Sequence, residues 1–95
     1  MHIISRKAIQ QFWGKYPNSK PALIRWFIIV EKATITTFDE LRQLFPSADF
    51  VGDFVVFNIG GNNYRLIASI HFNRNKLYVR HILTHAEYDK GNWKL

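Results

Sequence analysis

A polar segment near the end of the chain has side chains suited to acid–base chemistry. It reads "THAEYDK" from Thr84 to Lys90 and directly follows an apolar run typical of a β-strand. Histidine titrates near neutral pH, tyrosine offers a phenol, and lysine carries a positive charge. Because this combination can transfer protons and hold an anion, the segment is a candidate site rather than a featureless tail.

A strand upstream of this segment contributes Arg65. Side chains alternate between the two faces of a strand, and one face of residues 64–72 is almost wholly apolar. The opposite face carries Arg65, Ile67, Ser69 and His71. We expect helices to cover the apolar face and the face with Arg65 to stay open to solvent or a ligand. Alternation is less regular in "YVRHIL", so whether Arg80 or His81 shares the side of Arg65 stays open.

Helices are predicted in the first half of the chain. Apolar residues recur at helical spacing in three segments. The first begins at the N-cap Ser5 and ends before Pro17, and the second begins with Asn18 or Ser19 as its cap. The third covers residues 37–45 and opens on the spacing of a capping box.

Strands are predicted mainly in the second half. A short edge strand at 2–4 is followed much later by strands at 54–59, 64–72 and 77–83, joined by the turn sequences "GGNN" and "NRNK". This order predicts an α+β domain, with N-terminal helices packed on one face of a twisted, mostly antiparallel sheet.

Length and composition restrict the protein class. The 95 residues fit one domain spanning 1–95, and a 47% hydrophobic composition supports a folded core. The absence of cysteine excludes disulfides and thiolate metal sites. No apolar run has the length of a membrane span or a signal peptide, so a cytoplasmic protein without a membrane partner is expected.

The charge is positive and unevenly distributed. The net charge is +6, with five bases and no acid in residues 1–30, a net −3 in 31–59, and a net +4 in 60–95. Such a balance favours a polyanionic partner, which can be RNA, DNA, an acidic protein or an anionic membrane. A solvated surface with a chance bias is the alternative.

Two motifs together resemble a known family. "FNIGGNNYRLIASIHF" followed by "KLYVRHILTHAEYDKGNW" is similar to the core of HigB-type toxins of the RelE-like toxin–antitoxin superfamily, and the resemblance extends over almost the whole chain. It implies a small bacterial endoribonuclease, an mRNA interferase that inhibits translation by cutting mRNA in the ribosomal A site without a metal or other cofactor. It also implies a cognate HigA-type helix-turn-helix antitoxin. RelE itself has a site richer in lysine and arginine and lacks this histidine.

The resemblance assigns roles to three residues. Arg65 is expected to stabilise the charge of the transition state, His85 to act as general acid or base, and Tyr88 to stack on or orient the scissile nucleotide. The structural alternatives are an arginine paired with an acid, a histidine bonded to backbone, and a tyrosine packing the C-terminal turn onto the sheet. Glu87 is a further potential base, but we prefer it as the capping-box partner of Thr84.

Four other cations are expected to contact the RNA backbone or ribosomal RNA: Lys76, Arg80, Lys90 and Lys94. The remaining histidines lack metal-ligand spacing, so no metal site is predicted. Two other functions stay open, a non-catalytic RNA- or ribosome-binding protein and a plain interaction module. The antitoxin is expected to contact the two N-terminal helices.

Overall fold

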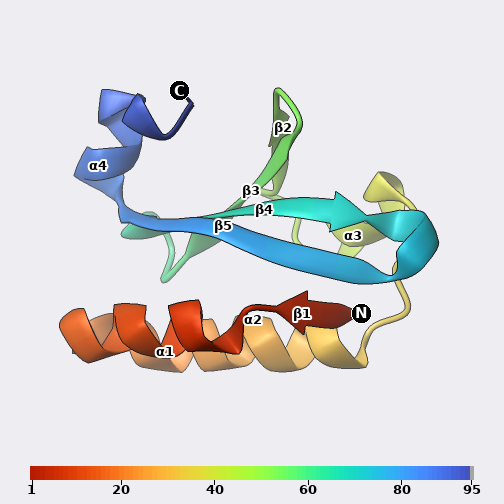
Figure 1. The fold of residues 1–95 in the computed structure, drawn as a ribbon, viewed down its shortest axis with the longest axis horizontal. Helices are drawn as coiled ribbons and strands as arrows, with labels where there is room; N and C mark the ends of the chain where they lie inside the picture. Colours follow the sequence, from red (N-terminus) through yellow and green to blue (C-terminus); the bar gives the residue numbers. More distant parts are fainter. Residues whose placement is uncertain (95) are drawn as a thin grey trace.

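Five strands form one sheet in the order β1–β5–β4–β3–β2, with α1 and α2 side by side on one of its faces (Figure 1). The computed structural model describes residues 1–94. The strands are β1 (His2–Ile4), β2 (Asp49–Val51), β3 (Phe54–Ile59), β4 (Tyr64–His71) and β5 (Lys76–Thr84). The helices are α1 (Arg6–Lys15), α2 (Lys20–Lys32), α3 (Phe38–Leu44) and α4 (His85–Lys90). β1 pairs with β5 in parallel and the other pairs are antiparallel, which confirms the predicted α+β class.

The helix starts follow the predicted caps with one exception. The Ser5 hydroxyl accepts from the Ala8 amide at 3.3 Å, and the Thr37 hydroxyl accepts from the Glu40 amide at 3.2 Å. Ser19 precedes α2 but does not cap it, because its buried hydroxyl donates to the carbonyl of Tyr16 at 2.6 Å. A 3₁₀ turn at Pro17–Ser19 makes that carbonyl the nearer partner.

The main core lies between the helices and the sheet. α2 contributes Leu23, Trp26 and Val30, and β4 contributes Leu66 and Ala68, all almost fully buried. This face of the sheet, termed the helix face, is the one that alternation in β4 predicted. No helix in residues 1–94 combines the length and apolarity that crossing a bilayer needs.

The opposite face, termed the Arg65 face, is not as open as expected. Ile67 is fully buried because Trp93 packs on it and on Val56, and Arg65 is 7% exposed with the Tyr88 ring beside its guanidinium. In Figure 1, α4 and the 3₁₀ turn at Asn92–Lys94 lie over the sheet on the side opposite α1 and α2. The prediction of an open face is therefore wrong at this end, since burying the Trp93 ring stabilises this segment.

A β-bulge explains the irregular alternation of β5. His81 lies opposite Ile67 and Val79 lies opposite Ala68, so Arg80 is an extra residue between two paired ones. Because the bulge shifts the alternation by one, His81 faces the Arg65 face, and Arg80 also reaches it through a hydrogen bond to Ser69.

Candidate active site

Arg65 is fixed by contacts around its guanidinium. β4 holds its backbone, while Nη1 donates to the carbonyl of Tyr64 at 3.0 Å and Nη2 donates to the side-chain oxygen of Asn62. Nη2 also lies 3.1 Å from Nδ1 of His85. The alternative of an arginine paired with an acid is wrong, because its side-chain partners are an amide and an imidazole. A guanidinium held this way on a strand is pre-oriented for an anion.

His85 is positioned as the first residue of α4. The helix starts with the predicted capping box, in which the Thr84 amide donates to Glu87 at 2.9 Å and the Glu87 amide donates to the Thr84 hydroxyl at 3.2 Å. The His85 amide donates to the carbonyl of Asn63 at 3.0 Å, which ties the helix start to the β3–β4 turn. The hydrogen bond from the Thr84 amide lowers the pKa of the Glu87 carboxyl below 4.5.

The contacts of His85 assign its proton. A guanidinium can only donate hydrogen bonds, so Nδ1 must be the acceptor and carries no proton. In the neutral ring the proton is then on Nε2, which lies 3.1 Å from Oδ2 of Asp89 one helical turn further on. The imidazole thus bridges a cation and a carboxylate and presents an unprotonated nitrogen to the guanidinium.

Tyr88 lies against both the guanidinium and the C-terminal segment. The centre of its ring is 5.5 Å from Cζ of Arg65, a cation–π arrangement. It also stacks on Trp93 with ring centres 5.3 Å apart and an interplanar angle of 16°. The indole N–H of Trp93 donates to the Tyr88 carbonyl at 3.2 Å. Tyr88 therefore has the packing role named as its structural alternative, and it lies beside Arg65 as well.

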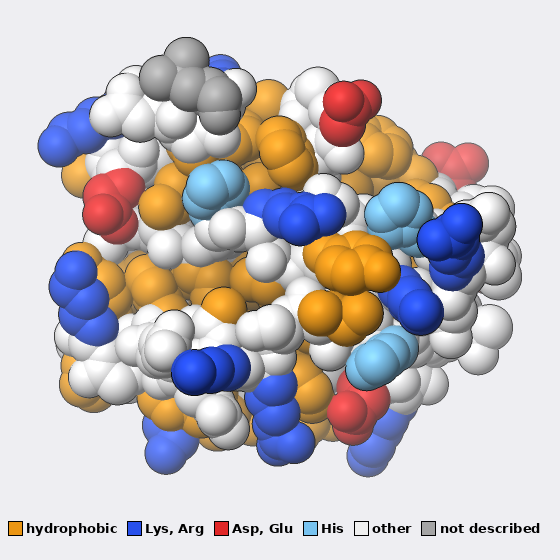
Figure 2. All heavy atoms as spheres, in the orientation of Figure 1, with side chains coloured by type: hydrophobic (Ala, Val, Ile, Leu, Met, Phe, Trp, Pro, Cys, Tyr) orange, Lys and Arg blue, Asp and Glu red, His pale blue; other side chains and the backbone are white. Residues whose placement is uncertain are grey.

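The four predicted RNA-contacting cations are spread over the molecule. Lys90 lies beside the site on α4 and lines a groove of about 380 Å³ with His81 and Trp93. Lys94 lies over the Trp93 ring at 5.5 Å, while Lys76 and Arg80 belong to β5 and extend away from the site. Figure 2 shows blue and pale-blue side chains in a row across the upper half of this view, with red acidic side chains scattered around them.

Three residues near the site were not predicted as part of it: Asn62, Asp89 and Trp93. The helical spacing of four between His85 and Asp89 was a usable signal. Asn62 belongs to a turn whose sequence predicts the backbone conformation of the turn but not which residue the Asn62 side chain contacts.

The arrangement can bind and activate one phosphodiester. Arg65 and His85, 20 residues apart in sequence, contact each other at 3.1 Å, so both reach a single linkage. A guanidinium can neutralise non-bridging oxygens, and an unprotonated imidazole nitrogen can accept a proton from a nearby hydroxyl.

Comparison with known proteins identifies the family of this chain. Residues 19–91 match the family model described as HigB_toxin, RelE-like toxic component of a toxin-antitoxin system. The chain is 39% identical over 93 residues to the mRNA interferase HigB of Escherichia coli O6:H1 strain CFT073, covering 95% of this chain and 90% of the relative. It is 36% identical over 92 residues to the mRNA interferase toxin HigB of Escherichia coli K12, covering 94% and 88%. A HigB of Shigella flexneri matches to the same extent. The chain therefore belongs to the HigB family of RelE-like toxic components of toxin–antitoxin systems.

Proposed function

We propose that this protein is an endoribonuclease that cuts mRNA and so inhibits translation; its relatives carry the name mRNA interferase. The observation that carries the proposal is the contact between Arg65 Nη2 and His85 Nδ1 at 3.1 Å. It joins a fixed cation and a proton acceptor from two different elements, which is the combination that cleavage of RNA by its own hydroxyl requires.

The reaction we propose begins when the scissile phosphate takes the place of His85 on the Arg65 guanidinium. Nδ1 of His85 is then free to accept the proton of the adjacent 2′-hydroxyl. The 2′-oxygen attacks phosphorus, the bond from phosphorus to the 5′-oxygen breaks, and Arg65 stabilises the charge on the non-bridging oxygens. The 5′-oxygen takes a proton from solvent, and His85 later returns its proton to solvent. The products are a 2′,3′-cyclic phosphate and a 5′-hydroxyl.

Asp89 and Tyr88 have supporting roles in this proposal. Asp89 accepts from Nε2–H and so keeps Nδ1 unprotonated and directed at Arg65. Tyr88 holds the guanidinium by the cation–π contact and offers an aromatic surface to the nucleotide. The chemistry needs no metal, because RNA supplies the nucleophile and Arg65 supplies the positive charge.

We further propose that the substrate is mRNA in the ribosomal A site, in the cytoplasm. The net charge of +6 supports binding to ribosome-held RNA. The test measures cleavage of mRNA on programmed ribosomes. Wild-type protein should cut in register with codons, and His85→Ala should lower the rate roughly 10²- to 10⁴-fold. Arg65→Lys should also lose most activity, since a lysine cannot bind phosphate in the same bidentate way.

The matched control is Arg42→Lys, because Arg42 is an exposed arginine of α3 remote from the site in sequence and contacts. It should cut like wild type. Cuts that persist in both site variants would show that the site is assigned wrongly. Tight ribosome binding by wild type without any cut would instead favour a non-catalytic binding protein.

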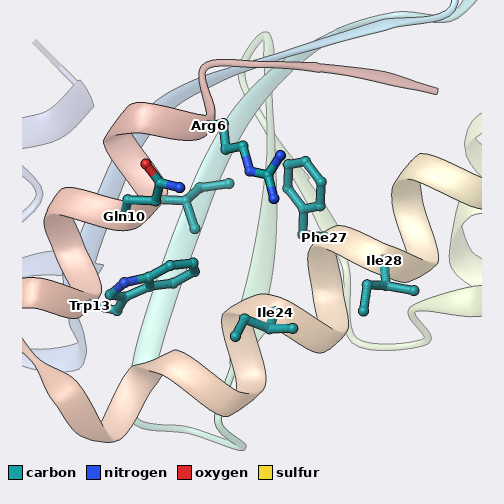
Figure 3. A pocket seen from close by; sticks show the side chains of 7 residues that line it. Arg6, Gln10, Trp13, Ile24, Phe27 and Ile28 are labelled. Atoms are coloured by element: carbon teal, nitrogen blue, oxygen red, sulfur yellow. The ribbon is translucent and has the colours of Figure 1, made fainter.

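Membership in a toxin–antitoxin family implies an antitoxin, and we propose that a HigA-type helix-turn-helix protein docks between α1 and α2. A groove of about 240 Å³ lies there, lined mainly by apolar side chains that include the exposed Ile24 and Ile28 (Figure 3). Arg6 lies at its rim over the Phe27 ring at 5.1 Å. Because residues 1–30 carry five bases and no acid, an amphipathic helix with acidic flanks fits this groove.

A further inference from the structure

A second group of side chains on the Arg65 face lies toward the β4–β5 turn. It consists of Ser69, His71, Tyr78 and Arg80, and we call it the Tyr78 patch. Nε of Arg80 donates to the Ser69 hydroxyl at 3.0 Å, and Cζ of Arg80 lies 5.2 Å from the centre of the Tyr78 ring. The His71 ring meets Tyr78 edge to face with ring centres 5.4 Å apart.

The bulge in β5 brings a histidine to the face of the patch. Tyr78 lies directly opposite Ser69, and on a regular strand Tyr78 and Arg80 would share a face while His81 faced away. With the bulge, both Tyr78 and Arg80 reach the Arg65 face, and His81 turns to the same face next to them. A bulge commonly redirects side chains at functional positions.

The Tyr78 patch is in line with the active site. Arg65 and Ser69 are four residues apart on one face of β4, which places them about 13 Å apart at ~3.3 Å per residue. A stacked nucleic-acid strand rises about 3.4 Å per nucleotide, so about four nucleotides or fewer span this distance. A strand gripped at Arg65 can therefore reach Arg80 without leaving the sheet.

The charges of the patch favour an anion. Within residues 1–94 Arg80 makes no ion pair, and its hydrogen bond goes to a neutral hydroxyl through Nε alone. Both Nη groups therefore stay free for the oxygens of one phosphate. The guanidinium lies over an aromatic ring, so an incoming base can extend the stack on either the guanidinium or the phenol.

We propose that the Tyr78 patch is a second RNA contact, which binds a base and a phosphate of single-stranded RNA a few nucleotides from the scissile linkage. The proposal rests on the endoribonuclease function proposed above. The ligand that we propose for the patch is RNA. An aromatic surface and a free guanidinium together match a nucleotide better than an acidic peptide, because a peptide of that kind offers no flat base to stack.

The test compares Tyr78→Ala, Tyr78→Phe and Arg80→Gln with wild type. It measures kcat/KM for mRNA cleavage on programmed ribosomes and Kd for a single-stranded RNA made uncleavable by 2′-O-methylation. Tyr78→Ala should lower both affinity and kcat/KM roughly fivefold or more, and Tyr78→Phe should restore them, because the ring stacks without its hydroxyl. Arg80→Gln should reduce the slope of log Kd against log salt by about 0.7, the value for one phosphate of a single strand.

Arg42→Gln is the matched control, since Arg42 is also exposed and lies over an aromatic ring, Phe38, at 5.9 Å, but on α3. It should leave kcat/KM and the salt slope unchanged. Wild-type cleavage that Tyr78→Ala and Arg80→Gln leave intact would overturn this proposal alone. Variants that lose antitoxin binding but keep RNA affinity would show a protein contact and overturn it as well. A wild-type protein that never cuts RNA would contradict the proposed function itself.

Discussion

His85 is held between a donor and an acceptor, and that is what gives its two nitrogens different roles. Arg65 can only donate, which leaves Nδ1 as the acceptor, and Asp89 takes the hydrogen bond from Nε2. The same pairing pattern, a carboxylate that fixes a histidine tautomer, is common wherever an imidazole has to accept a proton at one defined atom. At this site the carboxylate comes from the same helix turn as the histidine.

Asp89→Ala should therefore weaken the preference of His85 for the Nε2–H tautomer with little effect on folding. Because Arg65 still favours an unprotonated Nδ1, the Nδ1–H form should become a minor species in the variant, and Asp89→Asn should largely suppress it because its amide oxygen still accepts. Long-range ¹H–¹⁵N spectra of the neutral ring distinguish the two forms. The free energy of unfolding should change by less than about 0.5 kcal/mol, since the pair is exposed and one turn apart.

Asp39→Ala, an exposed acid on α3, controls for the loss of one negative charge and should leave the His85 spectrum unchanged. An Asp89→Ala protein whose neutral His85 keeps its proton on Nε2 would show that Arg65 alone sets the tautomer.

Some residues of the site can be predicted from the sequence, and others cannot. Arg65, His85 and Tyr88 were predicted because their types and motif indicate chemistry, and the structure places them together. Their catalytic roles stay predictions. Asn62 was not predicted, since its contact with Arg65 depends on how a turn curls back toward the strand. Trp93 was not predicted either, because nothing local says which surface a C-terminal indole covers.

At the scale of elements, α4 is the part of the site that is least stable as an isolated element. It has six residues and begins at the box formed by Thr84 and Glu87. Isolated helices of this length are unstable, so the cap and the packing of Tyr88 on Trp93 must hold it in place. Because His85, Tyr88 and Asp89 all belong to α4, its stability decides how well the site is formed.

Glu87→Ala should cost about 0.5–2 kcal/mol of unfolding free energy at neutral pH, as the loss of a cap does. The folded-state pKa of Glu87 is lowered below 4.5, so its contribution is complete above that value and is lost as pH falls through the folded pKa. The difference in unfolding free energy between wild type and Glu87→Ala should therefore become smaller at acidic pH. Urea unfolding at neutral and acidic pH measures it.

Ser5→Ala is the matched cap variant, because it removes the cap of α1, which involves no titrating group. Its cost should be similar at both pH values, and mRNA cleavage should fall in Glu87→Ala but not in Ser5→Ala. If Glu87→Ala lowers the unfolding free energy by the same amount at neutral and acidic pH, the Glu87 carboxylate does not stabilise α4.

Sequence periodicity predicted most elements but not their irregularities. α1, α3 and the strands β3, β4 and β5 lie within a residue or two of the predicted ranges, and α2 begins next to its predicted cap, because these segments are long enough to show a clear apolar period. β2 (Asp49–Val51) was missed, since three residues show no period. The bulge at Arg80 was visible only as a broken alternation, because a bulge is fixed by the partner strand, β4.

At the scale of the whole molecule, the sheet separates two surfaces with different partners. The Arg65 face carries the site and the Tyr78 patch, and α1 and α2 cover the helix face with their own groove directed away from the sheet (Figures 1 and 3). An antitoxin in that groove need not touch Arg65 or His85. The two proposed binding events can therefore be separated by substitution.

The double substitution Ile24→Asp and Ile28→Asp should abolish antitoxin binding and leave mRNA cleavage intact. Both side chains are exposed, 37% and 44%, so folding tolerates the change, whereas two carboxylates in the groove repel an acidic helix and remove its apolar contact. The matched control replaces Leu44 and Phe50, exposed by 45% and 47% elsewhere, with Asp and should keep full antitoxin affinity. Calorimetry with the cognate antitoxin measures both. If the groove variant binds as tightly as wild type, the antitoxin docks on another surface, and competition with uncleavable RNA then shows whether that surface is the Arg65 face.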